Sequence, residues 1–461
     1  MELKKKYNLF TAIAMVVGII VGSGVFFKAS SVLDAVEGNM YLSILAWILG
    51  GLVMIVSAYT FSLIAANSKK SGELADMAEE TVGRKHSFIQ SWYCTIIYYP
   101  LLVGVLGWVC ADFTCVLFGI DSRVLTVVLS FVYVIVMFGF NMIAPKIAGY
   151  LQISTTVIKL VPLVFMAIAG LIYGLISSDG FIVENFTSTS MFFGNEGFLG
   201  ALCGTCFAYE GWIVATTISK ELKDPKKTLP RALVIGTIIV LSIYIFYYIG
   251  LSGTFANSDF IEYGNSQILA AFSKITGGIG GTILYIFVVI SCVGTLNGLC
   301  MGTARNFKSI ADTDNGPKPE LFKSINRFNM NTASTICGFI LSLIWTGCWL
   351  TMLYIGLHGG KYWAIDISEL VIIFVYATYI PMYISIIRKR KDLNIFNRFV
   401  MPILAIGAAL LMVVAAFISH GIYGCFVFLI FTGAVLFIGM LFYKEKISTE
   451  NETQTKELAN E

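Results

Sequence analysis

The sequence predicts an all-α integral membrane protein with twelve transmembrane helices. Of its 461 residues, 57% are hydrophobic and 13% are charged, whereas a soluble domain carries about 25% charged residues. The apolar residues gather in runs close to the length of about 20 residues that crosses a bilayer. The polar stretches between these runs are too short to form a separate domain.

The apolar runs define the order of the spans and their orientation. We expect spans near residues 9–36, 40–66, 88–118, 122–140, 147–176, 196–219, 231–254, 279–311, 331–350, 366–387, 399–419 and 421–443. With the amino terminus in the cytoplasm, 26 of the 31 Lys and Arg residues lie inside and 3 lie outside. This imbalance predicts that both termini are cytoplasmic. The polar tail, 444–461, has no apolar period and is predicted to be disordered.

The first span contains two glycines near its middle, in the sequence Gly22-Ser23-Gly24. Each glycine costs a helix about 1 kcal/mol relative to alanine, so we expect the helix to open there. An open helix exposes N–H groups at the start of its outer half and C=O groups at the end of its inner half. These ends suit the carboxylate and the ammonium of a small zwitterion. The alternative is that Gly18 and Gly22 form a small-residue seam for helix packing.

The sixth span is interrupted in the same way, by the sequence F-A-Y-E-G-W at residues 207–212. Two interrupted helices five spans apart predict two inverted repeats, about 9–176 and 196–387, with 399–443 as an extra helix pair. Together they form one transporter-like domain, 1–443. Glu210 either contacts a ligand ammonium, carries a proton, or caps the outgoing half-helix. Phe207 is either a gate over the break or a packing residue.

Two lysines fall inside predicted spans. Lys159 lies about 18 Å along the fifth span at ~1.5 Å per residue, so it should face the bundle and find carbonyls or hydroxyls such as that of Ser291. Its role is either functional or that of a structural tether between helices. Lys28 lies near the outer end of its helix and is expected to reach the membrane interface.

No catalytic or metal chemistry is expected. The ten cysteines lie in or beside apolar runs and resemble small core hydrophobes. Cys203 and Cys206 have CxxC spacing but no companion ligands, and the three histidines are scattered. We therefore expect no enzyme activity, no cofactor and no metal. The chain has no basic patch interleaved with aromatics, so nucleic acid is not an expected partner.

Four motifs resemble a known family of membrane proteins. They are G-I-I-V-G-S-G-V-F at 18–26, F-A-Y-E-G-W at 207–212, E-L-K-D-P-K-K-T-L-P-R-A at 221–232 and S-C-V-G-T-L-N-G at 291–298, with Arg305 downstream. They resemble the amino acid–polyamine–organocation superfamily, and within it the bacterial L-amino acid exchangers of the serine/threonine or alanine-serine-cysteine kind. The resemblance implies a leucine-transporter-like fold with broken first and sixth helices.

The resemblance also implies a substrate site and a mode of transport. The substrate carboxylate would contact the amides of Gly22, Ser23 and Gly24, and the ammonium would lie near Ile19, Ile20, Phe207, Ala208 and Glu210. Lys159 would occupy the region in which sodium-coupled relatives bind an ion. We therefore expect sodium-independent exchange of small or medium neutral L-amino acids by alternating access.

The alternatives within transport are proton-coupled symport and antiport of cationic amino acids or polyamines. A channel or sensor would need a continuous polar lining or a signalling domain, which the sequence lacks. The expected location is the plasma membrane, with the lipid bilayer as surroundings and no obligatory protein subunit.

Overall fold

The computed structural model describes residues 7–68, 73–187, 197–326, 330–357 and 365–445. Within these ranges the secondary structure is helical, apart from turns and one isolated β-bridge. The helices are α1 (Leu9–Ile20), α2 (Gly24–Ala35), α3 (Met40–Ala65), α4 (Leu74–Thr81), α5 (Arg84–Tyr93), η1 (Cys94–Tyr98), α6 (Tyr99–Leu117), α7 (Arg123–Ile143), α8 (Pro145–Ile158), α9 (Leu160–Phe165), η2 (Met166–Gly170), α10 (Leu171–Ile176), α11 (Ile182–Thr187), α12 (Phe198–Ala208), η3 (Val214–Glu221), α13 (Pro225–Ser252), α14 (Asn257–Tyr263), η4 (Gly264–Ser266), α15 (Gln267–Ala311), α16 (Pro319–Lys323), α17 (Thr332–Leu357), α18 (Ile367–Lys389), η5 (Phe396–Val400), α19 (Met401–Ser419) and α20 (Gly421–Met440).

The helices confirm that this is an all-helical membrane protein. Among the described residues, ten helices are long and apolar enough to cross a membrane. The pair α1 and α2, bent by 57° at a short break, forms an eleventh candidate. The predicted span 196–219 appears as the short apolar helix α12, a turn and the 3₁₀ helix η3. The count of twelve spans and the inverted repeat stay predictions.

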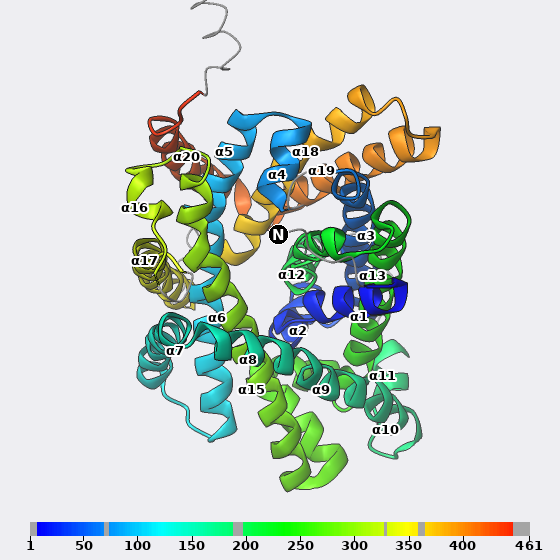
Figure 1. Ribbon diagram of the computed structural model, residues 1–461. Helices are drawn as coiled ribbons and strands as arrows, with labels where there is room; N and C mark the ends of the chain where they lie inside the picture. Colours follow the sequence, from blue (N-terminus) through cyan, green and yellow to red (C-terminus); the bar gives the residue numbers. More distant parts are fainter. Residues whose placement is uncertain (1–6, 69–72, 188–196, 327–329, 358–364, 446–461) are drawn as a thin grey trace, which may run out of the picture.

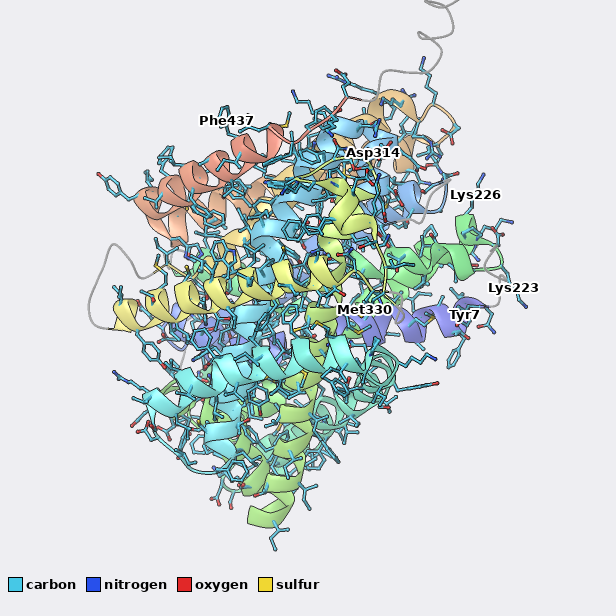
Figure 2. The ribbon with its side chains drawn as sticks, turned by 60° about the vertical axis from the view of Figure 1, so that its left-hand side comes forward. Tyr7, Lys223, Lys226, Asp314, Met330 and Phe437 are labelled. Atoms are coloured by element: carbon cyan, nitrogen blue, oxygen red, sulfur yellow. The ribbon has the colours of Figure 1, made fainter. Side chains whose placement is uncertain are left out.

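The broken helix pair lies near the centre of the molecule (Figure 1). There α2 packs against α12, and α1 packs against α13, which in turn packs against α3. On the other side α15, α6 and α17 pack together. The outermost helices expose large apolar side chains, such as Ile430 and Phe437 of α20, which are 71% and 70% exposed. Figure 2 shows Phe437 pointing away from the bundle, as expected of a side chain in contact with lipid.

Side-chain caps fix where several spans begin. Asn39 accepts a hydrogen bond from the N–H of Leu42 at the start of α3, and Ser122 accepts one from Leu125 at the start of α7. Asp366 accepts one from Ser368 at the start of α18. Such side-chain oxygens satisfy N–H groups that have no partner within the helix.

One predicted connection is largely helical. The stretch 255–278, expected to join two spans, contains α14, η4 and the first part of α15. The predicted span 279–311 is the second part of α15, which bends at Gly277 because this residue has a φ of 79°. Only a glycine adopts that conformation without strain. The predicted tail, 444–461, lies outside the described residues from residue 446 onward.

Both ends of the described chain are held by distant segments. Tyr7 forms a parallel β-bridge with Leu222, and the N–H of Lys223 donates to the carbonyl of Tyr7 at 3.3 Å. Figure 2 shows Tyr7 and Lys223 at the same edge of the molecule. At the other end, the N–H of Lys444 donates to Oδ1 of Asn315 at 2.7 Å. The segment before α1 is thus paired with the segment that follows η3.

Candidate functional site

The first span is broken where the two glycines predicted it. Helix α1 ends at Ile20 and α2 begins at Gly24. The first N–H of the second segment to find a helical partner is that of Phe26, which donates to the carbonyl of Ser23 at 3.1 Å. Earlier N–H groups, and the last carbonyls of α1, have no partner within their helices. One of them, the N–H of Gly22, donates to the hydroxyl of Tyr244 at 3.4 Å.

A second interruption follows α12. The helix ends at Ala208, and η3 begins only at Val214. Between them Gly211 has a φ of 106°, in the left-handed region that favours glycine. The chain therefore turns sharply beside Glu210, as the sequence F-A-Y-E-G-W predicted.

The two interruptions cross in direct contact. A Cβ atom on Gly24 would lie 2.6 Å from Cα of Ala208 and 3.0 Å from the carbonyl oxygen of Phe207. Reciprocally, a Cβ atom on Gly211 would lie 3.4 Å from the carbonyl oxygen of Ile19. Each break thus presents a glycine to the backbone of the other. Gly24 and Gly211 allow the ends of four helical segments to meet at one place.

The glycines of the first span do different things. A Cβ atom on Gly18 would lie 2.4 Å from Cγ2 of Thr156 in α8, so Gly18 forms a close helix contact. A Cβ atom on Gly22 would meet nothing nearer than 3.8 Å. The packing-seam interpretation therefore holds at Gly18. Gly22 has room for a methyl group, which would be in ordinary contact with Thr295 and the carbonyl oxygen of Ile20.

Phe207 belongs to a small aromatic cluster on the α2 side of the crossing. It is 7% exposed. Its ring meets that of Phe27 edge to face at 5.6 Å, and Phe27 meets Trp108 in the same way at 5.4 Å. Aromatic residues from α2, α12 and α6 thus cover the break on the side of α2. Either a gate or a packing contact requires this arrangement.

Glu210 precedes the N-cap position of η3, and its carboxylate accepts a hydrogen bond from the backbone N–H of Gly211. The N-cap of η3 is Ile213, which has no side-chain cap. The Glu210 carboxylate also accepts a hydrogen bond from the hydroxyl of Tyr98 at 2.6 Å. Within the described part of the chain, Glu210 forms no ion pair. A carboxyl group without a cationic partner among the described residues therefore lies at the crossing.

Lys159 lies where three spans meet. It is 4% exposed and falls between α8 and α9, as a lysine facing the bundle should. About one turn earlier, Thr155 packs against Gly294 of α15 and Thr156 packs against Gly18 of α1. The described residues include no hydrogen bond between Lys159 and Ser291, whose side chain is fully buried. That pairing stays a prediction.

Lys28 is buried, and the expectation that it reaches the interface is wrong. It is 1% exposed, and its Nζ lies 2.6 Å from Oδ2 of Asp366 and 2.6 Å from Oε1 of Glu369. These carboxylates cover the lysine, which would otherwise extend toward water. Sequence reasoning missed them, although their i, i+3 spacing at the start of an apolar span places them on one helix face.

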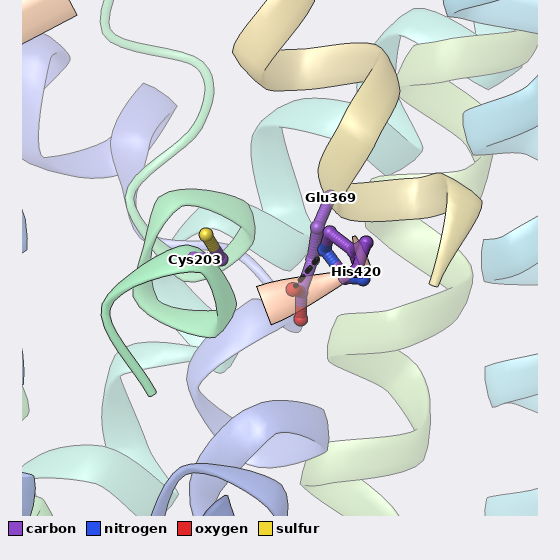
Figure 3. Close-up of side chains that lie close together, drawn as sticks. All are labelled: Cys203, Glu369 and His420. Atoms are coloured by element: carbon purple, nitrogen blue, oxygen red, sulfur yellow. Dashed lines mark ion pairs between the residues drawn. The ribbon is translucent and has the colours of Figure 1, made fainter. Parts of the chain in front are cut away.

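Glu369 also lies close to His420 and Cys203 (Figure 3). Nε2 of His420 is 3.2 Å from Oε2 of Glu369, and the potential ligand atoms of the three residues lie within 4.8 Å of one another. These residue types bind zinc elsewhere. Here the ammonium of Lys28 already contacts one oxygen of Glu369, which disfavours a divalent cation at the same carboxylate. We interpret the group as part of an ion-pair cluster.

A helical bundle of many spans, with one span broken and a second interruption packed against the break, defines a membrane transporter. The chain belongs to the amino acid permease family, whose model matches residues 7–440. It is therefore an amino acid transporter, not an enzyme.

Curated relatives align along most of the chain. The serine/threonine exchanger SteT of Bacillus subtilis (strain 168) is 30% identical over 389 residues, which is 84% of each chain. The b(0,+)-type amino acid transporter 1 of Mus musculus is 25% identical over 461 residues, covering 96% of this chain and 89% of the relative. The large neutral amino acids transporter small subunit 2 of Oryctolagus cuniculus is 23% identical over 384 residues, covering 80% and 70%.

Proposed function

We propose that this transporter exchanges small or medium neutral L-amino acids by alternating access and without sodium. The observation that carries the proposal is the crossing of the two broken segments, where helix ends meet and where a Cβ atom on Gly22 would fit without a clash. The similarity to a relative described as a serine/threonine exchanger supports the substrate class and the exchange mode.

In this proposal the backbone binds the charged groups that all amino acids share. The carboxylate binds the N–H groups of Gly22, Ser23 and Gly24 at the start of α2, where the helix dipole is positive. The ammonium binds carbonyls at the ends of α1 and α12, where the dipole is negative. We place it near Ile19, Ile20, Phe207 and Ala208. Gly22 has more room for the ligand than Gly24, which is already in close contact with α12.

Lys159 supplies the reason for sodium independence. Two unit charges 4 Å apart repel by about 4 kcal/mol at an effective dielectric constant near 20. An ammonium at the meeting point of α1, α8 and α15 would therefore disfavour a sodium ion nearby by about a thousandfold, since about 1.4 kcal/mol is tenfold. Proton-coupled symport is the alternative, with Lys159 or Glu210 carrying the proton.

The proposed topology assigns the two faces of the protein. Twelve spans would form two inverted five-span repeats and an added pair, with α12 and η3 as the sixth span. The reciprocal contacts of Gly24 and Gly211 support this, because inverted repeats place equivalent elements face to face. The distribution of Lys and Arg supports cytoplasmic termini in the plasma membrane, with no obligatory subunit. The Phe207 side of the crossing then faces outward, and Phe207 is the outer gate.

One observation favours a second substrate class. Glu210 places a carboxylate at the crossing, and no cation of the described chain pairs with it. A cationic amino acid or polyamine would supply the missing positive charge. We therefore keep exchange of cationic substrates as the alternative.

Counterflow in proteoliposomes tests the proposal. Purified protein is reconstituted with or without an internal amino acid, and uptake of labelled serine, threonine, alanine, leucine, lysine and putrescine is measured. We expect uptake of neutral substrates only into loaded vesicles, unchanged when choline replaces sodium or when a pH gradient is removed. Uptake into empty vesicles driven by a pH gradient would indicate symport instead, and a sodium requirement would refute both modes.

A further inference from the structure

The buried cluster around Lys28 joins parts of the chain that are far apart in sequence. Lys28 lies on α2, Asp366 and Glu369 begin α18, and His420 lies in the turn between α19 and α20. Helix α12 also reaches the cluster, because a Cβ atom on Gly204 would lie 3.5 Å from Oε1 of Glu369. Four regions of the fold therefore meet at one group of charges.

The same ammonium contacts the aromatic cluster over the break. Nζ of Lys28 lies 5.0 Å from the centroid of the Phe27 ring and 5.5 Å from that of Phe207. A cation at this distance from a ring face is attracted to it. Lys28 thus holds the Phe207 ring on one side and two carboxylates of α18 on the other. Moving α2 or Phe207 away from α18 requires these contacts to separate.

The cluster is closed on the lysine side and open on the carboxylate side. A cavity of about 230 Å³ is lined by Ser31, Asp366, Glu369 and His420, among other residues. The Asp366 side chain is 28% exposed, whereas that of Lys28 is 2% exposed. Water in this cavity can solvate the carboxylates as the ion pairs separate, which lowers the cost of opening relative to a sealed buried pair. A contact that only stabilised the fold would not need this access.

The charges in the cluster predict how the loss of Lys28 changes the contact between α2 and α18. Lys28 of α2 contacts both carboxylates at the start of α18, so the loss of its ammonium removes this attraction and should favour separation of α2 from α18. It also leaves two like charges side by side on α18, which should destabilise the protein. The replacement of Lys28 by arginine keeps the positive charge and should retain much of the contact.

We propose that Lys28, Asp366 and Glu369 form a latch that holds the gate residue Phe207 closed, with Lys28 as the positioning residue. The latch rests on the proposed function, because it is the outer gate of the transport path that it closes. When the latch opens, α2 and α12 separate from α18 together. When it closes, the ammonium of Lys28 again contacts the ring of Phe207.

Cys203 is a native reporter of the latch. It is fully buried, and its sulfur lies within 4.8 Å of ligand atoms of Glu369 and His420. Opening of the latch should expose it to the cavity. We would measure its modification by a charged maleimide in purified, detergent-solubilised protein. Cys348, an exposed thiol, is replaced by serine in every variant. Each measurement is repeated in a variant that also carries Cys203→Ala, so that the labelling of Cys203 can be told apart from that of the other cysteines.

We expect Lys28→Met to raise the rate of Cys203 modification about tenfold or more, which corresponds to about 1.4 kcal/mol in the closed-to-open equilibrium. Lys28→Arg should stay near the parent rate. The triple variant Lys28→Met, Asp366→Asn, Glu369→Gln removes the uncompensated charges, so it should recover thermal stability yet keep fast modification.

Slow modification of Cys203 in both the folded Lys28→Met protein and the triple variant would overturn the latch. A rise abolished in the triple variant would also overturn it, because the cause would then be buried unpaired charge. The assay uses no substrate. A failure of amino acid exchange would therefore refute the proposed function without deciding the latch, and the reverse also holds.

Discussion

Alanine substitutions at Gly22 and Gly24 should separate packing from ligand binding. In Gly24→Ala the new methyl carbon would lie 2.6 Å from Cα of Ala208, whereas carbon atoms in ordinary contact are about 3.5–4.0 Å apart. The backbones must separate by about 1 Å, and neither can rotate away as a side chain would. Overpacking of this kind costs about 1–3 kcal/mol, so we expect a lower apparent Tm.

Gly22→Ala is the matched variant two residues away. Its methyl group meets no atom nearer than 3.8 Å, so the free energy of unfolding should change by less than about 0.5 kcal/mol. The methyl group would occupy the space proposed for the substrate carboxylate. Loss of a hydrogen bond to a charged group costs about 1.5–3 kcal/mol, which raises Kd about tenfold to hundredfold.

The assay measures the apparent Tm of each purified variant and its shift with increasing amino acid, from which the relative Kd follows. We expect Gly24→Ala to lose stability, and Gly22→Ala to melt like the parent protein but to need more ligand for the same shift. Unchanged affinity in Gly22→Ala would refute the carboxylate site. Full stability in Gly24→Ala would refute the contact between the two breaks.

Two further changes test the charges near the crossing. Glu210→Gln should leave exchange of neutral amino acids within a few-fold and abolish any exchange of lysine or putrescine; equal loss of both classes in counterflow would show that the carboxylate does not select charge. Lys159→Ala should reach the membrane at normal levels and lose exchange, because the positive charge beside α1 is gone. Sodium-stimulated uptake by the parent protein would contradict the role given to Lys159, and unchanged counterflow in the variant would reduce it to a tether.

The break in the first span was predictable because its cause is local. Two glycines in three residues weaken the helix whatever surrounds it, and the structure bends there. The different roles of Gly18 and Gly22 were not predictable, since they depend on how closely Thr156 and Thr295 approach the two glycines. The same limit applies to Glu210, because the sequence could not show that the hydroxyl of the distant Tyr98 contacts its carboxylate.

The prediction that Lys28 reaches the membrane interface was wrong for a related reason. Its depth in the helix was correct, but a lysine near a helix end reaches water only if no other segment covers it. Asp366 and Glu369, more than 300 residues later in the chain, provide that cover. Long-range pairing of this kind leaves one trace in a single sequence, which is the presence of acidic residues on one face at the start of an apolar span.

The β-bridge between Tyr7 and Leu222 makes the segments before α1 and after η3 one mechanical unit. A displacement applied at the first is transmitted to the second through the backbone rather than through side-chain packing. A load applied to the chain just before α1 would therefore act on both broken spans. Such a load should slow the conformational cycle even where substrate binding is intact.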